Sequence, residues 1–286
     1  GTWAAVFGNG YNNTEEDDDP SATGNAVLFV VDLATGALIR KLDTGEGLAE
    51  DPNEEERPNG LATVAPVDDT GNRRIDFVYA GDLFGNLWRF DLHQAAPPSW
   101  SVRRLFLACS SDPCDDADRQ PITTRPSVVR HPTGRGRIVL FGTGQYLEPA
   151  DKIAGNAGLQ SFYGIWDEDN NVSANLGNLL AQSILSEQTL SFTTPQNSTV
   201  SYRLRATTSE RASWSEHRGW VLDLVPPSGT LQGERQITHS IVRNGRVIFT
   251  TLIPSEDPCR PGGDSWLMEL NAASGGRLTY APFDLN

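Results

Sequence analysis

One short pattern recurs along this 286-residue chain and limits its folds more than any other feature. An apolar, often aromatic, run leads into an acidic or amide residue and then into a turn. The side chain of such a residue bonds the turn backbone and a following Gly takes a positive φ, so each copy is interpreted as a strand ending in a turn. The copies are LFVVDLATG, LWRFDLHQA, FYGIWDEDN, GWVLDLVPPSG and WLMELNAASGG, with Asp32, Asp91, Asp167, Asp223 and Asn271 in equivalent places.

The rest of the chain also predicts short strands. Gly (27) and Pro (18) interrupt it every few residues, and the runs between them are rich in Val, Ile, Phe, Tyr and Trp, which is typical of strands joined by turns. The clearest runs are WAAVFG, AVLFVVDL, IDFVYAGD, GNLWRFDL, RIVLFGTG, SFYGIWD, GWVLDL, RVIFTTLI and SWLMEL. One stretch, residues 175–188, spaces Leu176, Leu179, Leu180 and Ile184 like one face of a helix, and we expect a helical insertion there.

We therefore predict an all-β fold, a β-propeller with four-stranded antiparallel blades. The spacing of the repeat copies suits such blades with loops of variable length. Residues 1–286 are expected to form a single propeller-domain fragment with about five blade-like repeats, truncated at both ends because the chain starts at Gly1 without Met and stops at FDLN. A stack of unrelated sandwich hairpins is the competing interpretation.

Charge and hydropathy exclude two classes of partner. The net charge is −14 and the isoelectric point is near 4.7, so the phosphates of a nucleic acid would be repelled. No apolar run approaches the roughly 18 residues that a membrane helix needs, so we predict no membrane span.

The three cysteines suggest an exported protein and no zinc site. Cys109 and Cys114 lie in CSSDPC, where a local disulfide is sterically reasonable and would suit an oxidising compartment. Cys259 has no obvious partner. No CxxC pair or Cys/His cluster is present, which argues against zinc.

The segment DDTGNRRID, residues 68–76, is the candidate metal site. Calcium loops place oxygen ligands on alternating residues, with a backbone carbonyl at the seventh position. A shorter relative closes with a carboxylate at the ninth. On that pattern the ligands are Asp68, Thr70, Asn72, the carbonyl of Arg74, and Asp76.

Two interpretations of this loop remain open. Only Asp68 and Asp76 are charged ligands, since Asp69 points the other way by alternation, and few carboxylates mean weak calcium affinity. Position six, usually Gly, is Arg73, which is strained at positive φ. The loop is therefore either a weak calcium site or one in which Arg73 or Arg74 replaces the cation and pairs with the two carboxylates. The chain end APFDLN resembles APVDDT at the start of this loop, so Asp284 and Asn286 are predicted to begin a second, truncated loop.

Seven ordered motifs carry a resemblance to a known family. They are FGNGYNN, VVDLATGALIRKLDTG, VDDTGNRRIDFVYAGDLFGNLWRFDL, QPITTRPSVVRHP, VLFGTGQYLEPAD, QSFYGIWD and GGDSWLMELNAASGG. Together they resemble the C-terminal domain of the type IV pilus tip-associated adhesin, or PilY, family and cover most of the chain.

The resemblance implies a modified, quinoprotein-like β-propeller that is exported through the periplasm to the bacterial surface and pilus tip. It also implies roles in pilus assembly and extension, twitching motility and host adhesion. The implied partners are minor pilins and a host-cell receptor or glycan. The family's calcium loop, which regulates pilus extension and retraction, falls on residues 68–76. Thr70, Asn72 and Arg73 depart from its usual pattern.

Two other functions remain as alternatives. A quinoprotein dehydrogenase would share the propeller, and Ala80, Asp82, Gly85 and Trp88 form a shortened copy of its blade-docking motif. The Trp of that motif packs between blades, however, and the vicinal disulfide expected beneath a quinone is missing, so we predict no quinone and no enzyme activity.

The other alternative is a carbohydrate-binding propeller. Trp100 and Trp214 lie in polar surroundings and are its candidate stacking platforms.

Overall fold

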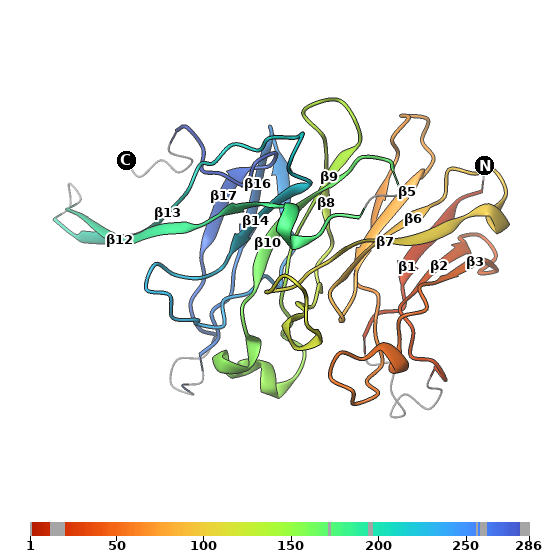
Figure 1. The fold of residues 1–286 in the computed structure, drawn as a ribbon, viewed down its shortest axis with the longest axis horizontal. Helices are drawn as coiled ribbons and strands as arrows, with labels where there is room; N and C mark the ends of the chain where they lie inside the picture. The colour runs from red at the N-terminus through yellow and green to blue at the C-terminus, as the bar shows by residue number, and fades with distance from the viewer. Residues whose placement is uncertain are drawn as a thin grey trace.

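The computed structural model describes residues 2–11, 21–170, 173–193, 197–255, 257 and 262–280. Successive sheets follow one another across the molecule in chain order, from β1 near the N-terminus to β17 near the opposite side (Figure 1). The helical segments that are described are 3-10 helices of three or four residues. They are Leu48–Glu50, Pro97–Ser99, Asp116–Asp118, Pro149–Lys152, Ala154–Ala157 and Leu176–Asn178.

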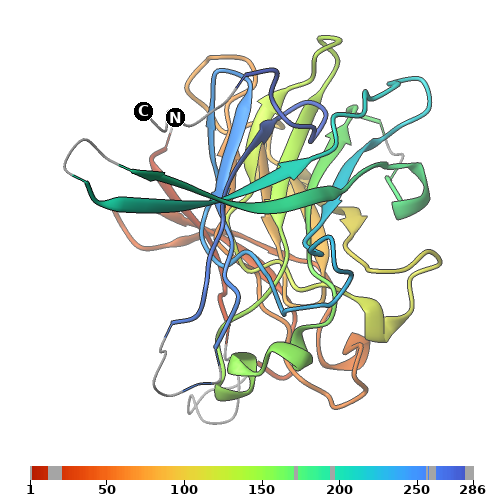
Figure 2. The ribbon, with the colours of Figure 1, turned by 90° about the vertical axis from the view of Figure 1, so that its left-hand side faces the viewer.

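Five sheets make up the described chain, and we number them one to five. Sheet one is ordered β1 (Ala4–Gly8), β2 (Val27–Asp32), β3 (Leu38–Asp43). Sheet two is ordered β4 (Ala65–Val67), β5 (Phe77–Gly81), β6 (Asn86–Asp91), β7 (Ser101–Leu107). Sheet three is ordered β11 (Leu180–Gln182), β14 (Gly219–Asp223), β10 (Ser161–Asp167), β9 (Arg137–Gly142), β8 (Ser127–Arg130). Sheet four is ordered β15 (Ile241–Arg243), β16 (Arg246–Thr250), β17 (Leu267–Asn271). Sheet five is the pair β12 (Ile184–Thr193), β13 (Thr199–Thr207), which forms a long hairpin (Figure 2).

The hydrophobic core lies between consecutive sheets rather than inside any one of them. One buried cluster joins sheets one and two, a second joins sheets two and three, and a third joins sheets three and four. The central strands therefore bury both faces. Along β5, Phe77 and Tyr79 face sheet three while Val78 and Ala80 face sheet one, as the two-residue period of a strand requires. Face-to-face packing of successive sheets is the stacking expected of a propeller.

All nine clearest strand runs form strands, and the repeat marks strand ends. Asp32, Asp91, Asp167, Asp223 and Asn271 are the last residues of β2, β6, β10, β14 and β17. In two copies the turn is the same: the Oδ1 atoms of Asp32 and Asn271 accept the backbone N–H groups two and three residues ahead. Gly36 and Gly275 follow at φ 73° and 69°.

The predicted helix at residues 175–188 is wrong. The segment contains the 3-10 turn Leu176–Asn178, β11 and the start of β12. Its apolar residues divide between two cores instead of sharing one face. Leu176 and Leu179 pack between sheets two and three, whereas Leu180 and Ile184 pack between sheets three and four. Tertiary burial on both faces of sheet three overrides the helical spacing.

Two details of the expected blades also differ. Four all-antiparallel strands occur in sheet two, whereas the other described sheets contain two, three or five strands, and β11 pairs with β14 in parallel. Two repeat copies, those of Asp167 and Asp223, lie in sheet three. One copy of the repeat therefore does not correspond to one sheet.

Candidate functional site

The loop at residues 68–76 connects β4 to β5 at one end of sheet two. The Asp76 N–H donates to the Val67 carbonyl at 2.8 Å and closes the hairpin below the loop. Asp68, Thr70, Asn72 and Arg74 are exposed, and Asp76 is buried. The predicted ligands therefore form a loop rim with one carboxylate at its base.

Asp68 organises the exposed half of the loop. Its Oδ1 accepts the N–H groups of Gly71 at 2.7 Å and Asn72 at 3.1 Å, and its Oδ2 accepts the N–H of Arg73 at 2.7 Å. Arg73 has φ +67°, the left-handed conformation expected at this position. Non-Gly residues rarely adopt it, and the Asp68 hydrogen bond holds it in place.

Asp76 organises the base. Its Oδ2 accepts the N–H groups of Asp69 at 2.8 Å and Thr70 at 3.2 Å, and the Thr70 hydroxyl lies 3.4 Å away. These donors fix the position of Oδ2 at the base of the loop. The Oδ1 atom of Asp76 accepts no hydrogen bond from the described residues.

The arginine interpretation does not match this geometry. Within the described part of the chain, no ion pair joins Arg73 or Arg74 to Asp68 or Asp76. Backbone N–H groups occupy the positions assigned to a guanidinium. The charge of Asp68 and Asp76 is therefore shared with the loop backbone rather than neutralised by a side chain.

Asp69 points away from the loop, as the alternation predicts, and joins a buried ion cluster. Its carboxylate pairs with two nitrogens of Arg137, at 2.6 Å from Nη2 and 3.1 Å from Nε. Arg137 is buried at the start of β9, and its guanidinium lies 4.3 Å from the centroid of the Phe77 ring. The loop of sheet two is thus fastened to sheet three by a bidentate charge pair.

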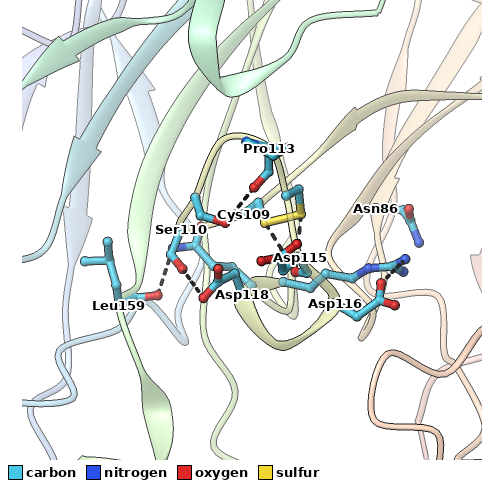
Figure 3. Close-up of a disulfide and its surroundings, with 12 residues drawn as sticks. Asn86, Cys109, Ser110, Pro113, Asp115, Asp116, Asp118 and Leu159 are labelled. Carbon is cyan, nitrogen blue, oxygen red and sulfur yellow. Dashed lines mark hydrogen bonds and ion pairs between the residues drawn. A yellow bond between two sulfur atoms is a disulfide. The ribbon is translucent and has the colours of Figure 1, made fainter.

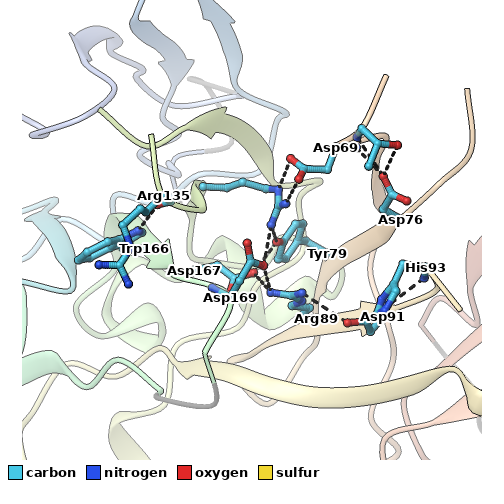
Figure 4. Close-up of polar contacts among 12 residues, drawn as sticks. Asp69, Asp76, Tyr79, Arg89, Asp91, His93, Arg135, Trp166, Asp167 and Asp169 are labelled. Atoms are coloured by element: carbon cyan, nitrogen blue, oxygen red, sulfur yellow. Dashed lines mark hydrogen bonds and ion pairs between the residues drawn. The ribbon is translucent and has the colours of Figure 1, made fainter. Parts of the chain in front are cut away.

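Behind Asp69 the cluster continues between the two sheets (Figure 4). Asp167, whose side chain is fully buried, accepts from Tyr79 Oη at 2.5 Å, Arg89 Nη1 at 2.6 Å and Arg103 Nη2 at 2.8 Å. Asp169 contacts Arg89 at 2.7 Å and a nitrogen of Arg137 at 3.1 Å.

The electrostatics of this cluster indicate a structural role. Burial alone would raise the pKa of Asp169, but Arg137 and Arg89 outweigh it and lower that pKa. Burial raises the pKa of Tyr79, and the charge of Asp167 adds to the effect. At neutral pH Tyr79 therefore keeps its proton and donates it in the bond to Asp167, and Asp169 stays ionised beside Arg89 and Arg137.

Among the described residues, no group of three or more His, Cys, Asp or Glu side chains has the arrangement of a metal site. A cation at this loop would therefore depend on two carboxylates and on hydroxyl, amide and carbonyl oxygens, a donor set typical of weak calcium binding. Asp284 and Asn286, the predicted second loop, lie outside the described residues.

Cys109 and Cys114 form a disulfide, with an S–S distance of 2.06 Å, at the base of an irregular loop (Figure 3). The loop closes through the Ser110 N–H, which donates to the Asp118 carbonyl at 2.9 Å. Cys259 lies outside the described residues.

The residues of the shortened blade-docking motif are structural. Trp88 is buried between sheets one and two, and its Nε1 donates to Asp82 at 2.7 Å. Asp82 also accepts the N–H groups of Phe84 and Asn86, which shape the turn from β5 to β6. This arrangement fastens the turn to the inter-sheet core.

The two Trp residues predicted as surface platforms are partly buried and packed. Trp100 Nε1 donates to the Gln94 carbonyl, and its ring packs against the core of sheets one and two. Trp214 meets His131 edge-on at 4.2 Å between ring centroids, and His131 stacks on Trp166 at 4.1 Å. Burial lowers the pKa of His131 to about 4, with Glu168 opposing. These contacts are those of a packed aromatic cluster.

Sequence reasoning missed the charged partners of the loop. Arg89 and Arg137 lie within LWRFDL and RIVLFG, runs interpreted only as apolar strands. A cationic residue inside an otherwise buried strand was the available signal, because a buried charge requires a partner.

Comparisons with known proteins point to one family. Residues 1–201 match the family model described as the PilY1 beta-propeller domain. A type IV pilus biogenesis factor PilY1 homolog of Xylella fastidiosa is 37% identical over 96% of this chain and 18% of that protein. The type IV pilus biogenesis factor PilY1 of Pseudomonas aeruginosa is 35% identical over 100% of this chain and 25% of that protein.

The solved structure of the P. aeruginosa PilY1 C-terminal domain is also similar. It has a TM-score of 0.80 and 32% identity, and the match covers 99% of this chain and 58% of that one. The chain thus spans about a quarter or less of these curated relatives and over half of the solved domain.

Proposed function

We propose a function from the premise that this chain belongs to the PilY1 family, whose family model matches residues 1–201. The chain supports type IV pilus biogenesis as a rigid β-propeller scaffold that acts by binding. The observation that carries this proposal is the family relationship, which extends over 96–100% of the chain in the matched relatives. The family is non-enzymatic, so a quinoprotein dehydrogenase is not the function of this chain.

The proposed partners are components of the pilus machinery, with minor pilins at the pilus tip as the expected contacts. The described part of the chain contains no helix with the length and apolar character to span a bilayer. We place the protein on the bacterial surface, at the pilus tip, and assign it a part in pilus extension, twitching motility and adhesion to a host receptor or glycan. The Cys109–Cys114 disulfide supports export to an oxidising compartment.

Calcium is the proposed regulator. The ion would be coordinated by oxygen atoms of Asp68, Thr70, Asn72, the Arg74 carbonyl and Asp76. The loop already folds through hydrogen bonds to its two carboxylates, and Asp69 fastens it to Arg137 of sheet three. That link supports a role for the loop in setting the junction of sheets two and three.

The function is tested in the bacterium that carries this protein. The chromosomal copy is replaced by a null allele, by the wild-type allele and by an Asp76→Ala allele, and surface pili are counted by electron microscopy. Loss of pili in the null strain and recovery with the wild-type allele are expected. Undiminished piliation and twitching in the null strain would contradict the proposal. Normal pili in the Asp76→Ala strain at every calcium concentration would contradict calcium regulation and leave the proposed role in pilus biogenesis standing.

A further inference from the structure

A groove of about 1030 Å³ lies where the β12–β13 hairpin crosses sheet four. Residues 265–270 line one side, residues 202–207 of β13 line another, and residues 277–280 complete it. Consecutive residues of a strand point to alternate faces. Six consecutive lining residues therefore place the groove along the edge of β17 rather than over one face.

Within the described residues, that edge carries backbone groups without a hydrogen-bond partner. β17 is the last strand of sheet four and pairs with β16 on one side. The Trp266 carbonyl accepts the N–H of Thr251, and the Ala272 N–H donates to Gly245, both on the β16 side. The Asn271 N–H donates to Gly276, away from β16. In an antiparallel sheet, successive residues of a strand direct their N–H and C=O groups alternately to one side of the strand and to the other. The N–H and C=O groups of Leu267 and Glu269 therefore point away from β16 and face the groove.

The β12–β13 hairpin crosses the strands of sheet four (Figure 2), and its residues 202–207 form a fixed wall of the groove. The Arg205 side chain, 2% exposed, pairs with Glu234 at 2.7 Å and Glu187 at 2.6 Å, and its guanidinium lies 4.1 Å from the centroid of the Trp266 ring. The buried pair holds β13 against the body of the protein without covering the β17 edge. Trp266 Nε1, which lies beside the groove, has no acceptor within the described residues.

The groove rim is positive although the protein as a whole is acidic. Arg277 is exposed and makes no ion pair with any described residue. Arg203 pairs with Asp264 at 3.4 Å, and both side chains are about half exposed or more. The Arg203 guanidinium also lies 4.5 Å from the centroid of the Trp266 ring. Glu269, the carboxylate in the groove lining, is already paired with Arg246. The rim therefore presents two cations to a partner.

We propose that the β17 edge is the docking site for an extended, acidic segment of another polypeptide, which adds to sheet four as a strand. Main-chain bonds to Leu267 and Glu269 supply affinity, and acidic side chains meet Arg203 and Arg277. Exposed strand edges are templates for such pairing unless they are blocked. The inference rests on the proposed function, since it states how a protein that acts by binding holds its partner.

The test uses a fluorescein-labelled heptapeptide of alternating Val and Glu, with binding followed by anisotropy. A control peptide of the same sequence is N-methylated at alternate residues, which removes its strand-pairing donors. The unmodified peptide is expected to bind saturably and to slow amide exchange at Leu267 and Glu269, while Met268 and Leu270 are already protected. No saturable binding at millimolar peptide, or equal binding of the methylated peptide, would overturn the proposal.

Matched variants separate the edge from the side chains. Leu267→Pro removes one outward N–H at the first residue of an edge strand, where Pro is tolerated, and is expected to weaken binding about tenfold or more. Leu267→Ala keeps the N–H and is expected to stay within about threefold of wild type. Melting curves confirm that both variants fold. Equal binding by Leu267→Pro and Leu267→Ala would contradict strand addition.

Charge reversal completes the test. Arg277→Glu is expected to slow association about fivefold or more at low salt. Arg243→Glu makes the same change on exposed β15, at the other edge of the sheet, and is expected to leave association unchanged. Equal effects of the two reversals would contradict the site. If peptide binding fails while piliation still depends on the chain, the docking site is wrong and the proposed function stands.

Discussion

The buried carboxylate of Asp167 is the most sensitive point in the junction of sheets two and three, and Asp167→Asn tests that statement. The substitution keeps the shape of the side chain and removes its charge. Tyr79, Arg89 and Arg103 all donate to this group, at 2.5, 2.6 and 2.8 Å. The Arg89 side chain is 7% exposed, so its charge would lose its closest partner without gaining water.

The magnitude follows from the partners that remain. Removing one member of a buried ion pair costs about 3–5 kcal/mol, because the other charge is left uncompensated. Asp169 at 2.7 Å and Asp91 at 3.4 Å still face Arg89, which places the expected loss at the lower end, about 3 kcal/mol. For a domain of this size that corresponds to a fall in Tm of about 5 °C.

The assay is urea unfolding at pH 7, followed by tryptophan fluorescence, with thermal melting as the second measurement. Asp91→Asn is the matched control, because Asp91 contacts the same Arg89 but is a quarter exposed. Its expected loss is below about 1 kcal/mol. If Asp167→Asn loses no more stability than Asp91→Asn, the cluster does not hold the two sheets together and the reasoning is refuted.

Three further predictions concern other parts of the fold. Burial alone would raise the pKa of Asp51, but the Arg57 side chain and the backbone N–H groups of Arg57 and Asn53 lower it to about 2. The stability it contributes is therefore present above its unfolded pKa of about 3.9 and is lost as the pH falls toward 2. Between pH 7 and pH 3 the Tm of Asp51→Asn should fall less than the Tm of wild type or of the exposed control Glu55→Gln. Equal falls in Tm would contradict a stabilising role for ionised Asp51. Reducing the Cys109–Cys114 disulfide should destabilise the protein by about 2 kcal/mol, as expected for closing so short a loop. A melting curve unchanged by dithiothreitol would contradict this, and the Cys109→Ser/Cys114→Ser double variant is the control. Trp88→Phe keeps an aromatic ring but removes the Nε1 bond to Asp82. Its free energy of unfolding in urea should therefore fall by about 2 kcal/mol. A fall no larger than that of the exposed control Trp3→Phe would contradict the structural role of Trp88.

Local signals predicted the strands and some of their turns. Asp32 and Asn271 act as expected, because an Asx side chain reaches the turn N–H groups wherever the turn forms. Asp167 occupies the same place in the repeat, yet it is buried among arginines. Its role depends on which sheet packs against it, and residue spacing within one strand carries no such information.

The helical spacing at residues 175–188 failed for the same reason. Leu179 and Ile184 pack on opposite faces of sheet three, and only the folded arrangement of three neighbouring sheets shows this. The loop at residues 68–76 was predictable in its turn geometry, including the positive φ of Arg73. Its attachment through Asp69 was not, because Arg137 lies in another sheet and far along the chain.

Our central proposal is that this member of the PilY1 family carries a calcium loop at residues 68–76, and isothermal titration with calcium tests it most directly. Wild-type protein should give a saturable signal for one site with a Kd of about 0.1–1 mM, as expected for an extracellular module with few carboxylates. Asp76→Ala should give no signal, while Asp69→Asn, which alters the Arg137 pair but no proposed ligand, should still bind. Absence of heat from the wild-type protein at millimolar calcium, or an unchanged signal in Asp76→Ala, would contradict the claim.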